Sequence, residues 1–319
     1  MFSIIVPLFN KSAHIEKCLK SIINQTFTEF EVVVVNDGST DDSFEKLQEI
    51  SIANNYSLLI INQENMGVST ARNNGVKAAK YDLIAFLDAD DWWEPTYLAE
   101  MKSIIETFPK AGIYGSSYYL VKHGIKKIAT IGVAPDFKQG YINYCEVYAK
   151  TLCMPLWTGA TIIPKAIFDT ESGFKTKLQL GEDFDLWVRI ALKYPVVFLN
   201  KPLSNYNQDV DNVGRGMTRK LLDKEAFFTF QLSYLEPEEK KNPELKKLLD
   251  NLRAVSLEHY FFKKKYSEEV REIISNIDFR NIQLKTRLTY KLPFPLAKIR
   301  FLFYKTASGL KSKMIKYTH

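Results

Sequence analysis

The fold is decided by the stretch Phe30-Glu31-Val32-Val33-Val34-Val35-Asn36-Asp37. Its four consecutive valines are β-branched and do not alternate with polar residues, which is typical of a strand covered on both faces. Asn36 and Asp37 then mark the end of the strand, and a turn containing Gly38 follows. A strand of this kind predicts a sheet with helices on either side.

Strands and helices alternate around this stretch. Short apolar runs indicate further strands, and apolar residues at helical spacing indicate helices. We expect strands at Ser3–Pro7, Leu58–Ile61 and Leu83–Leu87, and helices at Ile15–Ile23, Asp42–Asn54 and Val68–Ala79. This order predicts an α/β fold with a mainly parallel sheet, whose ligands bind at the carboxyl ends of the strands.

The chain of 319 residues is long enough for two domains. We expect an α/β domain over residues 1–215 and a helical region over residues 216–319, where strand signals are scarce. Apolar residues make up 46% and charged residues 25%, which excludes disordered, collagen and coiled-coil proteins. Three cysteines without a CxxC pair exclude a disulfide framework and a cysteine zinc site, and they favour a reducing, cytoplasmic compartment.

The C-terminal residues 280–319 carry ten Lys or Arg and no Asp or Glu. The rest of the chain therefore has 33 basic and 37 acidic residues, so the net charge of +6 lies in this tail. Cations interleaved with Leu, Ile and Phe favour peripheral binding to an anionic membrane, although an ordinary solvated surface has the same composition. Neither a signal peptide nor an apolar run of about 18 residues is present. No RNA-binding or zinc-finger motif occurs, and we expect no nucleic-acid partner.

Carboxylates gather after two of the predicted strands. Asp88 and Asp90, separated by Ala89, follow the strand that ends at Leu87. Hard oxygen ligands of this kind suit Mg²⁺ or Mn²⁺, although an acidic turn that caps the next helix has the same residues. Asp37 can accept hydrogen bonds from a base or a ribose, or belong to an ordinary turn.

A third acidic group lies at the start of a predicted helix, in Gly181-Glu182-Asp183-Phe184-Asp185-Leu186-Trp187-Val188-Arg189. An ionised Asp183 at a helix N-terminus can act as a general base, although first-turn acids commonly only complement the helix dipole. Asp185 and Arg189 are spaced to form a surface pair.

In their order and spacing these segments resemble the family 2 glycosyltransferases, inverting nucleotide-sugar enzymes with the GT-A fold, over roughly residues 1–210. The matching segments are Ile4–Lys11, Gln25–Phe27, Glu31–Asp41, Asn65–Gly75, Phe86–Asp91 and Gly181–Arg189. The resemblance implies a donor site with Pro7, Phe9 and Asn10, in which Phe9 stands where a tyrosine is more usual and stacks on the nucleobase. It also implies that Asp37 holds the base or ribose.

The same resemblance implies roles for the residues around the diphosphate and the acceptor. Arg72 lies near the base, and Ala89 contacts the donor. Asp88 contacts the ribose, or the metal through water, and Asp90 binds the metal directly. Asp183 deprotonates the acceptor hydroxyl, and Glu182 supports it or touches the acceptor. Many members also place a His after the catalytic helix, whereas residues 205–209 read Asn-Tyr-Asn-Gln-Asp here. A third metal contact is therefore left open.

The resemblance implies an inverting transfer of a sugar from a nucleoside-diphosphate donor, with UDP the most frequent nucleotide, and a Mg²⁺ or Mn²⁺ cofactor. The acceptor would be a glycan or a lipid-linked glycan of bacterial surface polysaccharide synthesis, at the inner face of the plasma membrane. Two alternatives stay open. A sugar nucleotidyltransferase would have a Gly-rich, basic loop after the first strand, where Phe9-Asn10-Lys11-Ser12 stands. A non-catalytic nucleotide-sugar-binding module could lack Asp90 or Asp183, and both are present.

Overall fold

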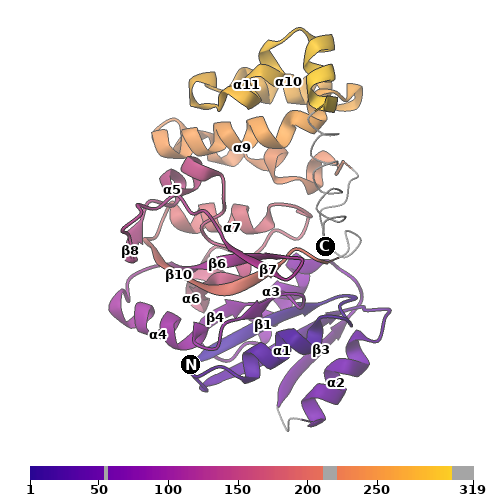
Figure 1. The fold of residues 1–319 in the computed structure, drawn as a ribbon, viewed down its shortest axis with the longest axis vertical. Helices are drawn as coiled ribbons and strands as arrows, with labels where there is room; N and C mark the ends of the chain where they lie inside the picture. The colour runs from indigo at the N-terminus through magenta and orange to yellow at the C-terminus, as the bar shows by residue number, and fades with distance from the viewer. Residues whose placement is uncertain (54–56, 211–220, 304–319) are drawn as a thin grey trace. The chain divides into compact units, whose positions relative to one another are not determined.

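The computed structural model describes residues 1–53, 57–210 and 221–303. It divides the chain into two compact units, Met1–Gln231 and Leu232–His319, whose elements are labelled in Figure 1. The predicted boundary between residues 215 and 216 falls outside the described residues, and so does the last part of the basic tail, residues 304–319.

The first unit is built on one ten-stranded sheet. Eight strands follow the order β3-β2-β1-β4-β9-β6-β10-β5, while β7 pairs with β6 and β8 with β10. Its strands are β1 Phe2–Leu8, β2 Phe30–Asp37, β3 Leu58–Gln63, β4 Leu83–Phe86, β5 Trp92–Trp93, β6 Ile113–Lys122, β7 Ile125–Ile128, β8 Gln139–Ile142, β9 Thr161–Pro164 and β10 Val196–Asn207. The neighbours β3, β2, β1 and β4 all run parallel. β9 runs antiparallel to both β4 and β6, and β10 returns parallel to β6. The predicted α/β class with a mainly parallel sheet flanked by helices is confirmed.

The helices of the first unit are α1 Ile15–Ile23, α2 Ser43–Ala53, α3 Val68–Ala78, α4 Tyr97–Thr107, α5 Tyr144–Thr151, α6 Lys165–Thr170 and α7 Glu182–Ala191. The helices expected before β2, β3 and β4 are thus present. Short 3-10 turns complete the unit, among them η1 Thr158–Ala160 and η3 Phe228–Gln231.

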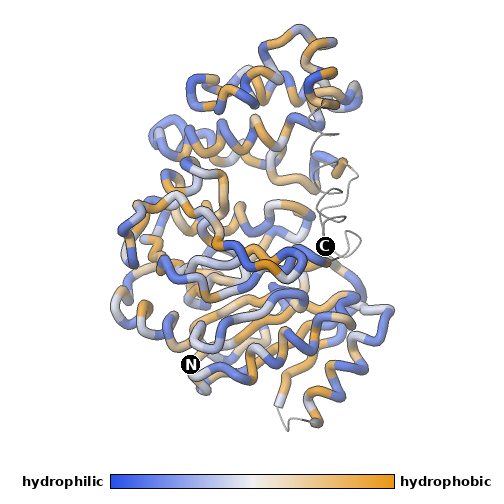
Figure 2. Tube along the Cα trace, in the orientation of Figure 1, coloured by the Kyte–Doolittle hydropathy of each residue, from blue (hydrophilic) through white to orange (hydrophobic). Residues whose placement is uncertain are grey.

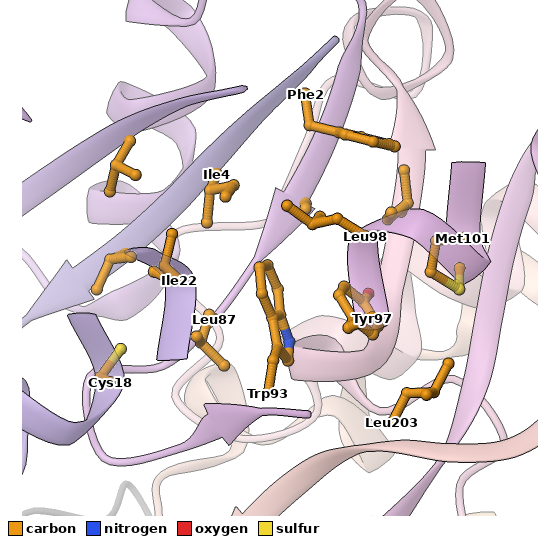
Figure 3. Packing of buried hydrophobic residues seen from close by; sticks show 14 of the residues in the cluster. Phe2, Ile4, Cys18, Ile22, Leu87, Trp93, Tyr97, Leu98, Met101 and Leu203 are labelled. Atoms are coloured by element: carbon orange, nitrogen blue, oxygen red, sulfur yellow. The ribbon is translucent and has the colours of Figure 1, made fainter. Parts of the chain in front are cut away.

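Two layers of helices cover the central strands, because successive strand residues point to opposite faces. On one face, β1, α1, α4 and β10 contribute to one apolar cluster, shown in Figure 3. On the other face α3 packs so closely that a Cβ atom added to Gly75 would lie 2.4 Å from the Ile5 side chain. Burial on both faces explains why residues 4–6 of β1 and 32–35 of β2 are continuously apolar, as the orange segments of the tube in Figure 2 show.

The second unit is helical, as predicted for the C-terminal region. Its helices are α8 Glu236–Glu239, α9 Pro243–Phe261, α10 Ser267–Ser275 and α11 Leu284–Lys291, and residues 294–303 are helical as well. Asn242 caps α9 by accepting hydrogen bonds from the backbone N–H groups of Glu244 and Leu245. Within residues 1–53, 57–210 and 221–303, no helix has both the length and the apolar character needed to cross a bilayer.

Candidate active site

Asp37, at the end of β2, is buried and fixes the loop that leads into α3. One of its carboxylate oxygens accepts hydrogen bonds from Gln63 Nε2 (2.7 Å) and the Met66 backbone N–H (2.8 Å), and the other accepts one from the Gly67 backbone N–H (2.9 Å). Because Gly67 directly precedes α3, this carboxylate sets where the helix begins. Its contact with a base or ribose stays a prediction.

The residues after β1 lie against the loop after β2. The Asn10 side-chain oxygen accepts a hydrogen bond from the Thr40 backbone N–H (2.8 Å), and the Asn10 backbone N–H donates to Ser39 Oγ (3.2 Å). Asn10 adopts a left-handed conformation with φ of 49°, which asparagine tolerates better than most residues. Pro7 is buried within β1, whereas Phe9 is 37% exposed. An exposed ring beside the strand ends is available for the predicted stacking.

Arg72 joins two acidic segments that are far apart in the sequence. Its guanidinium donates to Asp88 Oδ1 (2.7 Å) through Nη2 and to Glu182 Oε1 (3.0 Å) through Nη1. The Arg72 side chain is only 4% exposed and lies over the ring of Phe174. A buried guanidinium with two carboxylate partners draws the loop after β4 and the start of α7 together. Arg72 contributes to the site in this way, and its predicted proximity to the base is not tested by these contacts.

Glu182 and Asp183 form the first turn of α7. Asp183 accepts hydrogen bonds from the Phe184 backbone N–H (2.7 Å) and from Thr158 Oγ1 (3.4 Å). Burial raises the pKa of Asp183 above its ordinary value, and the nearby charge of Asp88 acts in the same direction. Burial and the charge of Asp183 raise the pKa of Glu182 to about 7, against the lowering effect of Arg72. Two acids with raised pKa values beside one another are a typical arrangement for proton transfer.

The loop after β4 presents three carboxylates with different surroundings. Asp88 pairs with Arg72, and Asp90 Oδ2 accepts a hydrogen bond from Lys11 Nζ at 2.7 Å. Asp91 is buried and accepts hydrogen bonds from the Asn207 backbone N–H (2.8 Å) and the indole N–H of Trp157 (3.3 Å). The side chain of Ala89 lies in the core, so only its backbone can reach a donor.

The carboxylate oxygens of Asp88 and Asp90 fit a hard divalent ion, because Mg²⁺ and Mn²⁺ take few protein oxygens and share the rest of their shell with water and phosphates. Across the described residues, no three His, Cys, Asp or Glu side chains are grouped to hold a metal by themselves. In the structure, the Lys11 ammonium group compensates the negative charge of Asp90. A metal on Asp90 would therefore have to displace the Lys11 ammonium group.

Sequence reasoning missed several contacts of this site. Lys11, Asp91 and Thr158 each bind an acidic or aromatic member of the site from a distant part of the chain. The predicted surface pair of Asp185 and Arg189 does form (3.0 Å), but its position on the surface was wrong. Asp185 is 1% exposed and also pairs with Lys175 at 2.6 Å. The 3.6-residue repeat places a residue on a helix face, but it does not say what covers that face.

Gly181 makes a sharp turn immediately before α7. It has φ of 80°, and an added Cβ atom would lie 2.2 Å from the Phe228 ring. We expect Gly181→Ala to destabilise the first unit by about 2–4 kcal/mol, because left-handed strain of about 1–2 kcal/mol adds to a clash of similar size. Urea unfolding measures this loss.

Gly124→Ala is the matched control for Gly181→Ala, because Gly124 has φ of 74° with no atom within 4 Å of an added Cβ. It should show the left-handed strain alone. If the two variants lost equal stability, Phe228 would have no part in holding the start of α7.

Comparison with known proteins places this site in a family. Residues 3–131 match the model of glycosyl transferase family 2. The chondroitin synthase of Escherichia coli is 41% identical over 228 residues, which is 72% of this chain and 32% of that protein. Three other curated bacterial glycosyltransferases are matched over 95–118 residues, and the chain spans 16–28% of their length.

Solved structures share the fold over almost the whole chain. A 1–349 fragment of Staphylococcus aureus TarS in complex with UDP-GlcNAc superposes with a TM-score of 0.70 at 21% identity, covering 94% of this chain and 87% of the fragment. The mannosyltransferase PcManGT of Pyrobaculum calidifontis, with GDP-Man and Mn²⁺, gives 0.54 at 18% identity over 99% of this chain and 82% of its own. With its family model, its curated relatives and its GT-A fold in agreement, the chain belongs to the family 2 glycosyltransferases.

Proposed function

We propose that the chain transfers a sugar from a nucleoside-diphosphate donor, UDP first among the nucleotides, to a hydroxyl group of a glycan or lipid-linked acceptor. The observation that carries this proposal is the Arg72 bridge, since it keeps the Asp183 carboxylate close to the loop of Asp88 and Asp90. The TarS and PcManGT structures hold UDP-GlcNAc and GDP-Man, which supports a donor of this class.

The transfer needs one proton acceptor and one leaving group. Asp183 accepts the proton of the acceptor hydroxyl while that oxygen forms its bond to the anomeric carbon, and the bond from this carbon to the diphosphate breaks. Attack from the face opposite to the diphosphate inverts the configuration, and no sugar–enzyme bond forms. Glu182 and Arg72 keep Asp183 in place, and the Thr158 hydroxyl orients its second oxygen.

Asp90, with Asp88 beside it, would hold Mg²⁺ or Mn²⁺, which when bound supplies positive charge to the leaving diphosphate. The presence of Mn²⁺ in the PcManGT complex supports this cofactor. Lys11 lies 2.7 Å from Asp90, and once displaced from this carboxylate by the metal it would leave a second positive charge near the diphosphate.

Thermal unfolding with UDP, in the presence and absence of Mn²⁺, tests the proposal. We expect UDP to raise the melting temperature, and Mn²⁺ to increase that shift. Asp90→Asn should lose the Mn²⁺-dependent part of this shift in melting temperature. Its apparent Mn²⁺ affinity should be at least about tenfold weaker, because one direct ligand is neutralised.

Asp136→Asn, a change of an exposed carboxylate elsewhere in the first unit, should behave as the unchanged chain. A chain that shows no shift with UDP, GDP or any nucleotide sugar would contradict the proposed function. Unchanged Mn²⁺ dependence in Asp90→Asn would contradict only the metal site.

We also propose that the second unit binds the inner face of a bacterial plasma membrane, where surface polysaccharides are assembled. Residues 284–303 expose seven apolar side chains, namely Leu284, Leu288, Phe294, Leu296, Ile299, Leu302 and Phe303. The same segment carries five cations and no acidic residue: Lys285, Arg287, Lys291, Lys298 and Arg300. Apolar side chains among cations match an anionic lipid surface.

Vesicle sedimentation tests the membrane proposal. Leu296→Glu with Ile299→Glu should reduce binding to vesicles with phosphatidylglycerol by at least about tenfold, since two apolar contacts are lost and two negative charges face the lipid. Ile125→Glu, at an exposed position in β7 of the first unit, serves as the control and should leave binding unchanged. Equal binding of both variants would refute the proposal.

A further inference from the structure

Two aromatic side chains form a tilted pair next to the acidic residues of the site. The rings of Trp157 and Tyr206 have centroids 4.0 Å apart with an interplanar angle of 35°, and Tyr118 lies behind Trp157 at 5.9 Å. Both members of the pair pack against the second apolar cluster of the first unit, yet they stay partly exposed. The pair is therefore supported by the core while part of its surface is open.

Hydrogen bonds tie this pair to both sides of the reaction centre. The Trp157 indole N–H donates to Asp91, which follows the metal-binding candidate Asp90 directly. The next residue, Thr158, donates to Asp183. Asp91 also accepts the backbone N–H of Asn207, the residue after Tyr206. One buried carboxylate thus positions both aromatic residues, and one dipeptide connects them to the general base.

The order of the strands shows which substrate this pair would meet. The nucleotide is expected over β2 and β1, where Asp37 and Phe9 lie. The carboxylates that would hold the diphosphate follow β4, the neighbour of β1 in the sheet. Trp157 precedes β9 and Tyr206 lies in β10, and both strands are on the other side of β4. The pair thus lies beyond the diphosphate, on the side away from the nucleotide and beside Asp183.

We propose that Trp157 and Tyr206 form the binding platform for the acceptor, and that the acceptor group is a pyranose ring of a glycan. The C–H bonds on one face of a pyranose carry partial positive charge and pack on the negative face of an aromatic ring. Asp183 needs an acceptor hydroxyl within hydrogen-bond reach, and the platform lies one residue from the Thr158 that binds Asp183. This inference rests on the proposed function and assigns a substrate class to it.

Direct binding tests the platform. With UDP and Mn²⁺ present, 4-nitrophenyl pyranosides of glucose, galactose, N-acetylglucosamine and N-acetylgalactosamine are titrated by calorimetry. At least one should bind, and Trp157→Ala and Tyr206→Ala should each weaken that binding at least tenfold. Trp157→Phe keeps a ring and should weaken it less than threefold. UDP affinity should stay within twofold in all variants, which also shows that they are folded.

Tyr141→Ala is the matched control, because Tyr141 is an exposed tyrosine of β8 that none of the site contacts involve. A chain that binds UDP but none of the pyranosides overturns the platform and leaves the proposed function standing. So does a Trp157→Ala variant that loses affinity for the UDP-sugar donor while its affinity for the pyranoside is unchanged. Absence of UDP binding in the unchanged chain would instead overturn the proposed function itself.

Discussion

Replacing Asp183 with asparagine is expected to lower the rate of sugar transfer by at least ~100-fold, the usual scale of general-base catalysis. The asparagine side-chain oxygen can still accept the Phe184 backbone N–H, which Asp183 binds at 2.7 Å, so the first turn of α7 should keep its shape. The amide cannot take up the proton of the acceptor hydroxyl. Initial rates of transfer, together with UDP affinity as a test of folding, measure the effect.

Asp169→Asn provides the control, because Asp169 is an exposed carboxylate on the neighbouring helix α6. It should leave the rate unchanged. If Asp183→Asn kept more than a tenth of the rate with normal UDP affinity, another group would have to accept the proton.

The pH dependence of transfer also tests the prediction that Asp183 is the general base. Since burial raises the pKa of Asp183, the base becomes protonated, and the rate falls, at a pH above the ordinary value of 3.8 for aspartate. A profile of kcat/KM that stays flat down to pH 4 in the unchanged chain would argue against Asp183 as the base.

Much of the fold could be predicted from local sequence. The run of valines in β2 needs burial on both faces, and the helical spacing before and after it supplies the covering layers. The positions of Asp37, Asp88 and Asp90 then follow from topology, because parallel strands end at the same edge. These features follow from the hydrophobic pattern and from the direction of the strands, and both can be recognised in short segments of sequence.

The connections between the acidic residues could not be predicted in this way. Arg72 binds Glu182 across 110 positions, and Asp91 binds Asn207 across 116. Nothing in the spacing of the charges tells whether a buried guanidinium meets one carboxylate or two. The contact between the rings of Trp157 and Tyr206 likewise depends on the place of β9 and β10 in the sheet, where the antiparallel β9 interrupts the pattern of alternating strands and helices.

Arg72→Met should cause the largest loss of stability among the substitutions considered, about 3–5 kcal/mol. Methionine retains most of the volume over the Phe174 ring, so the loss comes mainly from the carboxylates of Asp88 and Glu182, which keep their burial and lose their common cation. Arg72→Lys retains the charge, but an ammonium group has no planar fork to bind two carboxylates. Its stability should therefore lie between that of the unchanged chain and that of Arg72→Met. Urea unfolding of the first unit gives the free energy of unfolding of each variant.

The dependence of this loss on pH distinguishes an electrostatic cause from a packing defect. Arg72 lowers the pKa of Glu182, so its removal raises that pKa further above about 7. A group whose pKa is raised by folding stabilises the folded state below its unfolded value and loses this contribution as pH rises through the folded value. Arg72→Met should therefore be much less destabilised at pH 5, where Glu182 is protonated, than at pH 8.

Adding Glu182→Gln should restore about half of the loss at pH 8, since Asp88 is 26% exposed and can be hydrated. If the loss were equal at both pH values and unaffected by Glu182→Gln, Arg72 would act by filling space, and the link it provides between the loop after β4 and α7 would lose its electrostatic basis.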